Sequence, residues 1–420
     1  MKKNSPLILL FLLAVTSMMF LISGCSKDSL QKNKTYTYTI LSPVYKAKAS
    51  VLAGINGSAS QSIEHAGKIY IKDNFIFLNE TDKGIHIINN SNPAHPVQVA
   101  FLSIPGNQDI AVKGNILYAD MYNDLLAIDI TNPTHVNTSS QLRNLFTERG
   151  YVNGVLTNTE QEVVTDWIKK DTTVTVDESI NPYPECLGCN FDLAPAGSTK
   201  SASGVAGSMA GMVMIGDYLY AITERHSLGV INLSNASVPK FESSMFAGFD
   251  LQTIYPFENK LFLGSAIGMF IYDVSDPVHP TALGQFSHGR ACDPVITDGS
   301  YAYVTLHAGT ECGGDDNELN VINVQNLLQA ELVKSYPLTK PTGLCKDGNL
   351  LFVCDSSEVK VYDAANPADL KLLQQIKSNE PYDIIASNKK ALVVANDGLY
   401  QYDYSDLLHI RLLSFLATKK

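Results

Sequence analysis

Residues 346–367, KDGNLLFVCDSSEVKVYDAANP, decide the fold. They contain a tight turn, an apolar run, a second turn, another apolar run that ends in Tyr-Asp, and an Asn-Pro stop. The first turn and run recur as KDNFIFLNE (72–80), KGNILYAD (113–120), GDYLYAIT (216–223), ENKLFLGS (258–265), DGSYAYVT (298–305) and NKKALVVAN (388–396). The second run recurs as GIHIIN (84–89), LLAIDI (125–130), LGVINL (228–233), MFIYDV (269–274), LNVINV (319–324) and LYQYDY (399–404). Self-similarity with a period of about 40 residues is typical of propellers and solenoids.

Each repeat has room for four short strands. Proline ends the second run in several repeats because it cannot donate to a strand ladder, and another apolar stretch follows, such as 97–104. One more strand fits before the first turn. The sequence therefore predicts an all-β protein, a seven-bladed β-propeller of four-stranded antiparallel blades.

The repeats also predict the domain limits. Residues 43–420 are expected to form the propeller, with an insertion at 143–207 between blades 2 and 3 that includes a strand over 162–176. Two segments, 43–52 and 407–417, compete to be the outer strand that closes the ring. The sequence does not decide between these two.

The N-terminus predicts export. Lys2 and Lys3 precede an apolar run at 6–22, and small residues stand directly before Cys25, as in a secretory signal peptide. This pattern resembles the lipobox of bacterial lipoproteins, which implies a signal peptide at 1–24 and lipidation of Cys25. An uncleaved anchor with an incidental cysteine is the alternative. Residues 25–42 are polar and are expected to be a flexible tether. We expect a protein attached to the outer membrane by its N-terminal lipid, facing the periplasm or the cell surface.

Charge excludes one class of partner. The formal charge is −11, and loss of Lys2 and Lys3 with the signal peptide makes the mature chain −13. An acidic protein repels phosphate backbones, so nucleic acid is not an expected partner.

Six cysteines remain after Cys25, and an exported chain permits disulfides. Cys292 and Cys312 fall on one face of the predicted propeller, so we expect a bridge between them. Cys345 and Cys354 flank a tight turn whose register would pair Cys345 with Leu350, so we interpret both as buried thiols. Two possibilities stay open for the remaining pair: a small disulfide loop or half a metal site, without a second Cys/His pair nearby for zinc. That pair is Cys186 and Cys189.

The runs MFIYDVSDP, LLAIDITNP and VKVYDAANP resemble those of the LVIVD-repeat proteins, over residues 67–417 apart from the insertion. The resemblance implies an extracytoplasmic β-propeller, often a lipoprotein in bacteria related to Bacteroides. It implies no particular reaction.

Two groups of residues are candidates for a ligand site. The first lies where the inner strands begin, around the mouth of the central channel, where carboxylates could hold a cation or cationic ligand, or cap loop amides. These are Asp109, Asp293 and Asp383, with Lys68, Gly211, Thr253 and Thr342 at the equivalent positions of other blades. The second group lies in loops on the same face and suits an anionic ligand or acid–base work, or is ordinary solvated loop. These are Glu224, Arg225, His226, His288, Arg290 and His307.

The sequence lacks the common catalytic signatures, including the G-x-S-x-G elbow, H-E-x-x-H, the P-loop and the dinucleotide fingerprint. We therefore expect no cofactor, no metal and no assigned catalytic residue. The predicted function is that of a monomeric binding or scaffold module of the cell envelope, with a protein or glycan partner. The alternative is a hydrolase or lyase that acts at the channel mouth.

Overall fold

The computed structural model describes residues 33–177, 208–209, 211–291, 294–309 and 314–419. The chain divides into two compact units, and the described part of the smaller one comprises residues 33–42 and 168–177. The larger unit contains residues 43–167 and the rest of the described chain. Cys25, the expected signal peptide, Cys186, Cys189, Cys292, Asp293 and Cys312 all lie outside the described residues.

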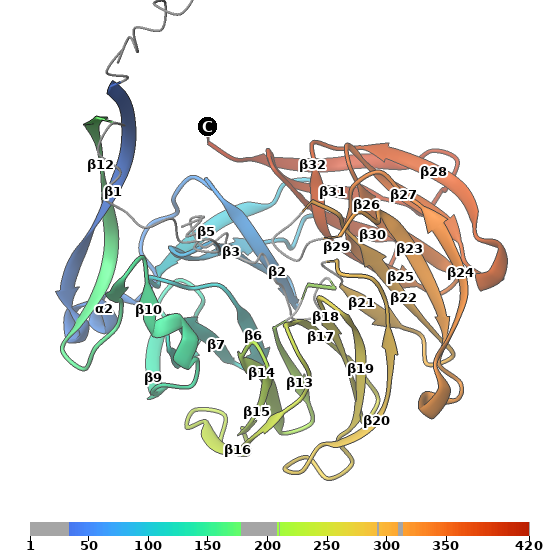
Figure 1. The fold of residues 1–420 in the computed structure, drawn as a ribbon, viewed down its shortest axis with the longest axis horizontal. Helices are drawn as coiled ribbons and strands as arrows, with labels where there is room; N and C mark the ends of the chain where they lie inside the picture. Colours follow the sequence, from blue (N-terminus) through green and yellow to red (C-terminus); the bar gives the residue numbers. More distant parts are fainter. Residues whose placement is uncertain (1–32, 178–207, 210, 292–293, 310–313, 420) are drawn as a thin grey trace, which may run out of the picture. The chain divides into compact units, whose positions relative to one another are not determined.

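The larger unit contains, within the described residues, seven sheets of four antiparallel strands, arranged as the predicted seven-bladed β-propeller (Figure 1). In each blade the strands are hydrogen-bonded in sequence order, from the inner to the outer strand. Blade 1 consists of β2 (Ala66–Lys72), β3 (Phe75–Glu80), β4 (Gly84–Asn89) and β5 (Val97–Ser103). Blade 2 consists of β6 (Ile110–Lys113), β7 (Ile116–Met121), β8 (Asp124–Asp129) and β9 (Asn137–Leu142). Blade 3 consists of β13 (Met212–Ile215), β14 (Tyr218–Glu224), β15 (Ser227–Asn232) and β16 (Lys240–Phe246).

Blades 4 to 7 repeat the same order. Blade 4 consists of β17 (Leu251–Phe257), β18 (Lys260–Ser265), β19 (Gly268–Asp273) and β20 (Thr281–Ser287), and blade 5 of β21 (Val295–Thr297), β22 (Tyr301–Leu306), β23 (Glu318–Asn323) and β24 (Glu331–Pro337). Blade 6 consists of β25 (Pro341–Asp347), β26 (Leu350–Asp355), β27 (Glu358–Asp363) and β28 (Lys371–Lys377). Blade 7 consists of β29 (Pro381–Ser387), β30 (Lys390–Ala395), β31 (Gly398–Asp403) and β32 (Arg411–Ala417). The inner strands of all blades begin on the same face of the propeller. The turns between the second and third strands also lie on this face, which we call the entrance face.

The third strand of every blade ends in an Asp or Asn that stops the ladder by forming a turn. The side chain of Asp273, for example, accepts a hydrogen bond of 2.7 Å from the backbone N–H of Ser275. Such a side chain mimics a backbone turn, so the residue both ends the strand and starts the loop. The equivalent bonds form at Asn89, Asp129, Asn232, Asn323, Asp363 and Asp403. The recurring Asp or Asn in the sequence is therefore a structural residue.

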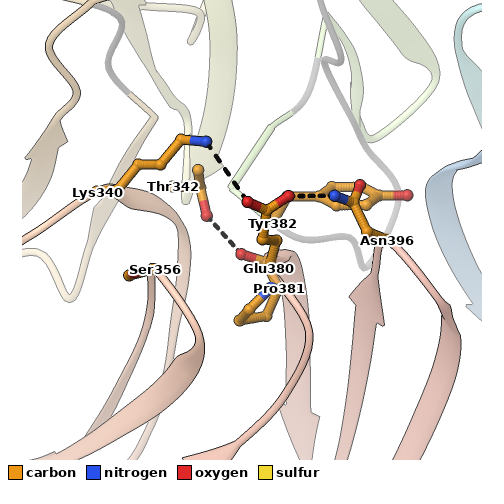
Figure 2. A pocket seen from close by; sticks show the side chains of 7 residues that line it. All are labelled: Lys340, Thr342, Ser356, Glu380, Pro381, Tyr382 and Asn396. Carbon is orange, nitrogen blue, oxygen red and sulfur yellow. Dashed lines mark hydrogen bonds and ion pairs between the residues drawn. The ribbon is translucent and has the colours of Figure 1, made fainter.

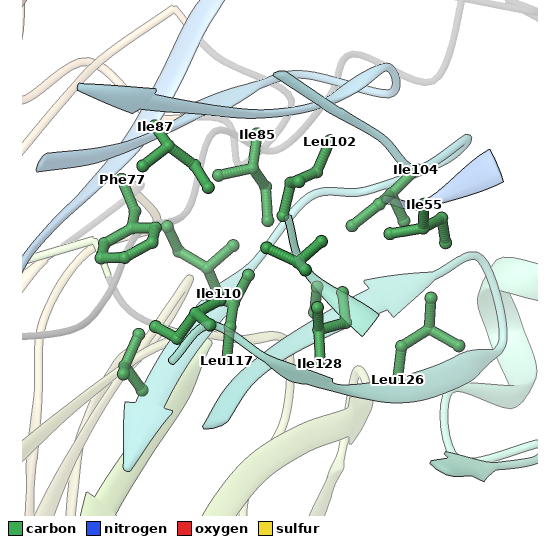
Figure 3. Close-up of a cluster of buried hydrophobic side chains, with 14 of the residues drawn as sticks. Ile55, Phe77, Ile85, Ile87, Leu102, Ile104, Ile110, Leu117, Leu126 and Ile128 are labelled. Carbon is green, nitrogen blue, oxygen red and sulfur yellow. The ribbon is translucent and has the colours of Figure 1, made fainter. Parts of the chain in front are cut away.

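The core is divided among the seven contacts between neighbouring blades, and Figure 3 shows the cluster between blades 1 and 2. In β7, Leu117 and Ala119 pack toward blade 1, whereas Ile116 and Tyr118 pack toward blade 3. Successive side chains of a strand point to opposite faces, so a strand between two blades is apolar on both sides. Burial of each large apolar side chain contributes about 1.5–3 kcal/mol.

The ring closes between blades 7 and 1 without exchange of a strand. Residues 411–417 form the outer strand β32 of blade 7. The side chains of Asn90 and Gln401 exchange two hydrogen bonds across this junction, and Ile63 forms a parallel bridge with Thr418. A dedicated hydrophobic cluster joins the two blades. Of the two candidates for the closing strand, 407–417 is the one that takes the place.

Residues 33–54 differ from the prediction. Residues 33–47 form β1 (Asn33–Ala47), which pairs with β12 (Glu162–Asp177), and α2 (Lys48–Gly54) follows. The prediction of an outer propeller strand at 43–52 is therefore wrong. The flexible tether expected over residues 25–42 is also wrong from residue 33 onward, where the chain forms a strand. Alternating Thr and Tyr at 35–39 have high strand propensity, which explains the difference. The expected strand over 162–176 is β12. The short elements η1 (Thr147–Gly150), β10 (Tyr151–Val152) and β11 (Val155–Leu156) precede it.

Candidate functional site

The channel mouth brings three charged residues to neighbouring positions. Asp383, Lys68 and Asp109 stand at equivalent points of blades 7, 1 and 2, where each inner strand begins. All three are buried, with 3 % or less of each residue exposed. Gly211 and Thr253 occupy this position in blades 3 and 4, as the sequence predicts. In blade 6 the position belongs to Gly343 and not to the predicted Thr342, because Leu344 pairs with Val353 as Ile384 pairs with Val393 in blade 7. Asp293 of blade 5 lies outside the described residues.

Asp109 has several partners. Its Oδ2 accepts hydrogen bonds from Lys68 Nζ at 2.6 Å and from the backbone N–H of Gly211 at 3.0 Å, and its Oδ1 accepts one from Ile110 N at 2.8 Å. Burial raises the pKa of Asp109, and the charge of Lys68 opposes this effect. Burial also lowers the pKa of Lys68 to about 8, against the pull of Asp109. The two side chains thus form a buried ion pair that joins blades 1 and 2.

Asp383 has fewer partners. Its Oδ1 accepts a hydrogen bond from the N–H of Ile384 at 2.9 Å, but its Oδ2 has no hydrogen-bond partner among the residues that the structure describes. Burial raises the pKa of Asp383 to about 7, and the charge of Lys68 offsets only part of this rise. Both aspartates therefore cap the amide that follows them, and Asp383 keeps an oxygen available.

The chain that enters blade 3 passes through the channel at this level. Ser208 is buried, and its Oγ accepts a hydrogen bond of 2.9 Å from Leu344 N on the inner strand of blade 6. Gly211, three residues later, bonds to Asp109 of blade 2. An inner strand pairs with its blade along one edge only, so the N–H groups of its other edge face the channel. The hydrogen bond to Leu344 N therefore places the side chain of Ser208 in the channel.

A second set of carboxylates was not recognised in the sequence. Glu80, Asp120 and Asp355 stand at or near the end of the second strand in blades 1, 2 and 6, and each binds backbone N–H groups of the loop before the inner strand. Asp355, for instance, accepts from Thr339 N and Lys340 N at 2.9 and 2.7 Å. The repeated acidic residue in LNE, YAD and VCD was the available signal. These residues position the channel mouth and are structural.

The predicted loop group is only partly brought together. Glu224 accepts hydrogen bonds from Thr147 Oγ1 at 2.6 Å and Ser227 Oγ at 3.1 Å. Nδ1 of His226 accepts a bond of 3.3 Å from the N–H of Asp250, whose carboxylate lies 3.6 Å from Arg290. His226, Arg290 and the backbone of Arg225 thus lie at the junction of blades 3 and 4 on the entrance face. The side chain of Glu224 instead contacts Thr147, which precedes blade 3 in the chain.

The other members of this group lie elsewhere. His307 Nδ1 is 2.8 Å from the carbonyl oxygen of Pro341 in blade 6, and His288 Nδ1 is 2.5 Å from the carbonyl oxygen of Gly289. The backbone N–H of Arg225 donates to Glu148 at 2.9 Å. Most of these side chains therefore have structural partners within the loops.

An exposed aromatic pair accompanies the loop group. Phe246 and Phe249 lie with ring centroids 5.0 Å apart, and the ring of His226 is 5.4 Å from Phe249. The two phenylalanines are 57 % and 55 % exposed. Phe246 ends the outer strand of blade 3 and Phe249 lies in the loop to blade 4, so both are on the entrance face. Sequence reasoning missed them because Phe in a strand repeat normally indicates core.

A small pocket of about 130 Å³ opens between blades 6 and 7 (Figure 2). Glu380 lies at its centre, 4.0 Å from Lys340 and hydrogen-bonded to Asn396. Thr342 Oγ1 donates to the carbonyl oxygen of Pro381 at 2.9 Å. The remaining lining residues are Ser356 and Tyr382. Its polar lining and small volume suit a few atoms of a ligand.

The cysteines of blade 6 are free thiols as predicted, but Cys354 is buried whereas Cys345 is only half-buried, and their predicted register is wrong. Cys345 and Cys354 are free thiols, and burial raises the pKa of both well above the ordinary value. Cys345 pairs with Phe352 rather than with Leu350, because Asp347 and Leu350 close the turn. The described residues contain no group of three or more His, Cys, Asp or Glu side chains that could hold a metal ion. None of the helices in the described ranges has the length and apolarity needed to cross a membrane.

Comparison with known proteins supports the fold. The LVIVD repeat family matches residues 64–101 and 106–142, which contain blades 1 and 2. No curated protein matches the sequence. A protein from Lactobacillus plantarum is 14 % identical, with 84 % of this chain and 96 % of that chain covered and a TM-score of 0.53.

Two further solved structures are similarly distant. The periplasmic gluconolactonase PpgL of Pseudomonas aeruginosa is 10 % identical, covers 84 % of this chain and 95 % of its own, and has a TM-score of 0.52. BamB from Moraxella catarrhalis is also 10 % identical, covers 86 % of this chain and 99 % of its own, and has a TM-score of 0.50. Likeness at this level of identity shows the propeller fold alone.

Proposed function

We propose that this chain, a seven-bladed propeller that carries LVIVD repeats, is a lipid-anchored, exported binding module of the cell envelope. The sequence before Cys25 supports export and lipidation, and the propeller supplies a rigid platform. Its entrance face presents a partner-binding surface at the junction of blades 3 and 4. The partner we propose is another envelope protein.

The exposed pair of Phe246 and Phe249 carries this proposal. Two large aromatic rings that remain more than half exposed leave apolar surface in water, which folding alone does not explain. Charged groups of both signs lie beside them, because Asp250 directly follows Phe249 in the chain and its carboxylate lies 3.6 Å from Arg290. Aromatic anchors within a polar rim are the usual composition of a protein-binding hot spot.

The test is crosslinking in intact cells, followed by purification of the C-terminally tagged protein and identification of what co-purifies. We expect one stoichiometric envelope protein in the wild type and its loss in a Phe246→Ser/Phe249→Ser variant. Phe241→Ser is the matched control, because Phe241 is also exposed on β16 but stands near the opposite end of the strand. Recovery of the same partner with the double variant would contradict the proposed surface.

A further inference from the structure

The buried carboxylate of Asp383 lacks a compensating group. Only 1 % of the residue is exposed, and within the described part of the chain Oδ2 has no hydrogen-bond partner. A buried polar atom without a partner costs free energy, and an ionised one costs much more. A buried carboxylate oxygen of this kind indicates either a bound proton or a ligand that the site holds.

The neighbouring charges show what the ligand must supply. Lys68 stands between Asp383 and Asp109 in the order of the blades, but its Nζ bonds to Asp109 Oδ2 at 2.6 Å. The N–H of Gly211 adds a second donor to that oxygen. The positive charge of Lys68 therefore balances Asp109. Among the described residues at the starts of the inner strands, Asp383 is then the acidic side chain without a hydrogen-bonded counter-charge.

Lysines in and next to blade 6 are engaged with other carboxylates: Lys346 with Asp298, Lys360 with Asp355 and Lys340 with Glu380. Cys345, which is half-buried, and the buried Cys354 lie nearby as thiols whose raised pKa keeps them neutral. Gly343 brings the backbone of blade 6 so close to Asp383 that an added Cβ would lie 2.6 Å from the carbonyl oxygen of Tyr382 and 3.0 Å from Asp383 Oδ1. The inner strands thus place backbone next to the carboxylate, and backbone carbonyl oxygens are good ligands for alkali-metal ions.

We propose that the propeller channel binds one monovalent inorganic cation, Na⁺ or K⁺, with Asp383 Oδ2 as its anionic ligand. The single positive charge of such an ion neutralises the carboxylate of Asp383. The charge of a divalent ion would exceed the negative charge of Asp383 and would be repelled by Lys68. Divalent ions also usually require six or more oxygen ligands with several carboxylates. This site is independent of the partner surface on blades 3 and 4.

The first test measures the thermal midpoint of the purified full-length protein in NaCl, KCl, CsCl and N-methyl-D-glucamine chloride at equal ionic strength. We expect NaCl or KCl to raise the midpoint by on the order of 2 °C over the large organic cation, saturably with concentration. The rise disappears in Asp383→Asn and persists in Asp369→Asn, which alters an exposed aspartate of η3 (Pro367–Asp369). Equal midpoints in all four salts, or a rise that survives in Asp383→Asn, would overturn the proposal.

A second test does not depend on the folding of a variant. Wild-type crystals grown with RbCl in place of KCl or NaCl are examined for the anomalous signal of Rb⁺, a close analogue of K⁺. A peak in contact with Asp383 Oδ2 supports the site. An ordered channel without a peak there, or a peak only on the protein surface, refutes it. Calcium chloride in a parallel crystal shows whether a divalent ion takes the place instead, which would also refute it.

Discussion

Asp109 and Asp383 occupy the same position in two blades and have different surroundings. Both are buried, and both bond through Oδ1 to the amide of the next residue. Asp109 also binds Lys68 and Gly211 through Oδ2, whereas the Oδ2 of Asp383 has no hydrogen-bond partner within the described ranges. The two blades therefore share the backbone position and the hydrogen bond from Oδ1 to the next amide, but the partners of Oδ2 differ.

The preceding blade makes the difference. Lys68 of blade 1 reaches forward to Asp109 of blade 2, but the equivalent position of blade 6, the blade before Asp383, holds Gly343, which has no side chain to offer. Thr342 stands one residue earlier. The hydroxyl of Thr342 donates to the carbonyl oxygen of Pro381 and so does not serve Asp383. One substitution in one repeat thus decides whether an aspartate in the next repeat is a partner in an ion pair or a candidate ligand.

The largest effect is expected from removal of the well-partnered aspartate. Asp109→Ala leaves Lys68 buried without its counter-charge and should reduce the free energy of unfolding by about 3–5 kcal/mol, measured by urea unfolding. The double variant Lys68→Met/Asp109→Leu should recover most of that loss, because it removes both charges and keeps the volume. A loss below 1 kcal/mol in Asp109→Ala would show that the pair does not hold blades 1 and 2 together.

Glu80 tests a carboxylate whose partners are backbone amides and a histidine. Burial alone would raise its pKa, but hydrogen bonds from His86 and from the N–H groups of Glu64 and His65 outweigh burial and hold the pKa below 4.5. Glu80→Gln should therefore cost about 2–3 kcal/mol at neutral pH.

The pH dependence of this loss follows from linkage. A depressed pKa stabilises the folded state above the unfolded pKa of about 4.5, and the contribution disappears as pH falls through the folded value. The difference between wild type and Glu80→Gln in urea unfolding should therefore shrink steadily below pH 4.5. A constant difference down to acid pH would contradict a role for the ionised carboxylate.

Asp383→Asn should change the free energy of unfolding differently from the matching substitution of Asp109. The substitution removes a buried charge that lacks a counter-charge and keeps the shape of the side chain. In a buffer without small cations, the unfolding free energy should change by less than about 1 kcal/mol or increase. Asp109→Asn, measured in the same buffer, should be clearly destabilising. Equal losses in the two variants would mean that the surroundings of the two aspartates are equivalent.

The smallest effect on stability is expected at the aromatic pair. Phe246→Ser/Phe249→Ser alters exposed side chains of the entrance face, so unfolding free energy should change by no more than roughly 0.5 kcal/mol per site. Circular dichroism and urea unfolding measure this. A large loss of stability would show that the rings belong to the core, which would remove the main support for the partner surface.

The sequence predicts the fold almost completely because each blade is encoded locally. Apolar runs, tight turns and the Asp or Asn at the end of the third strand all lie within one repeat, so they can be recognised in the linear chain. The strand at 33–47 escaped prediction because its partner, β12, lies more than a hundred residues away.

The site is harder to predict because contacts between blades determine it. The sequence placed Asp109 and Asp383 at the channel mouth, but the bond between Lys68 and Asp109 depends on how neighbouring blades pack. The exposure of Phe246 likewise depends on its place at the last residue of an outer strand. The burial of Ser208 in the channel had no signal at all in the small-residue stretch that contains it.

The contiguous construction of the blades has a consequence for folding kinetics. Within a described blade, each strand pairs with one that is close in sequence, so the loop-closure entropy of these contacts is small and blade formation should be fast. The contacts between Asn90 and Gln401 join residues 311 positions apart, and the bridge between Ile63 and Thr418 spans a similar distance. Closure of the ring should therefore be the slow and last step. The same junction should be the first to open under tension between the two ends of the chain.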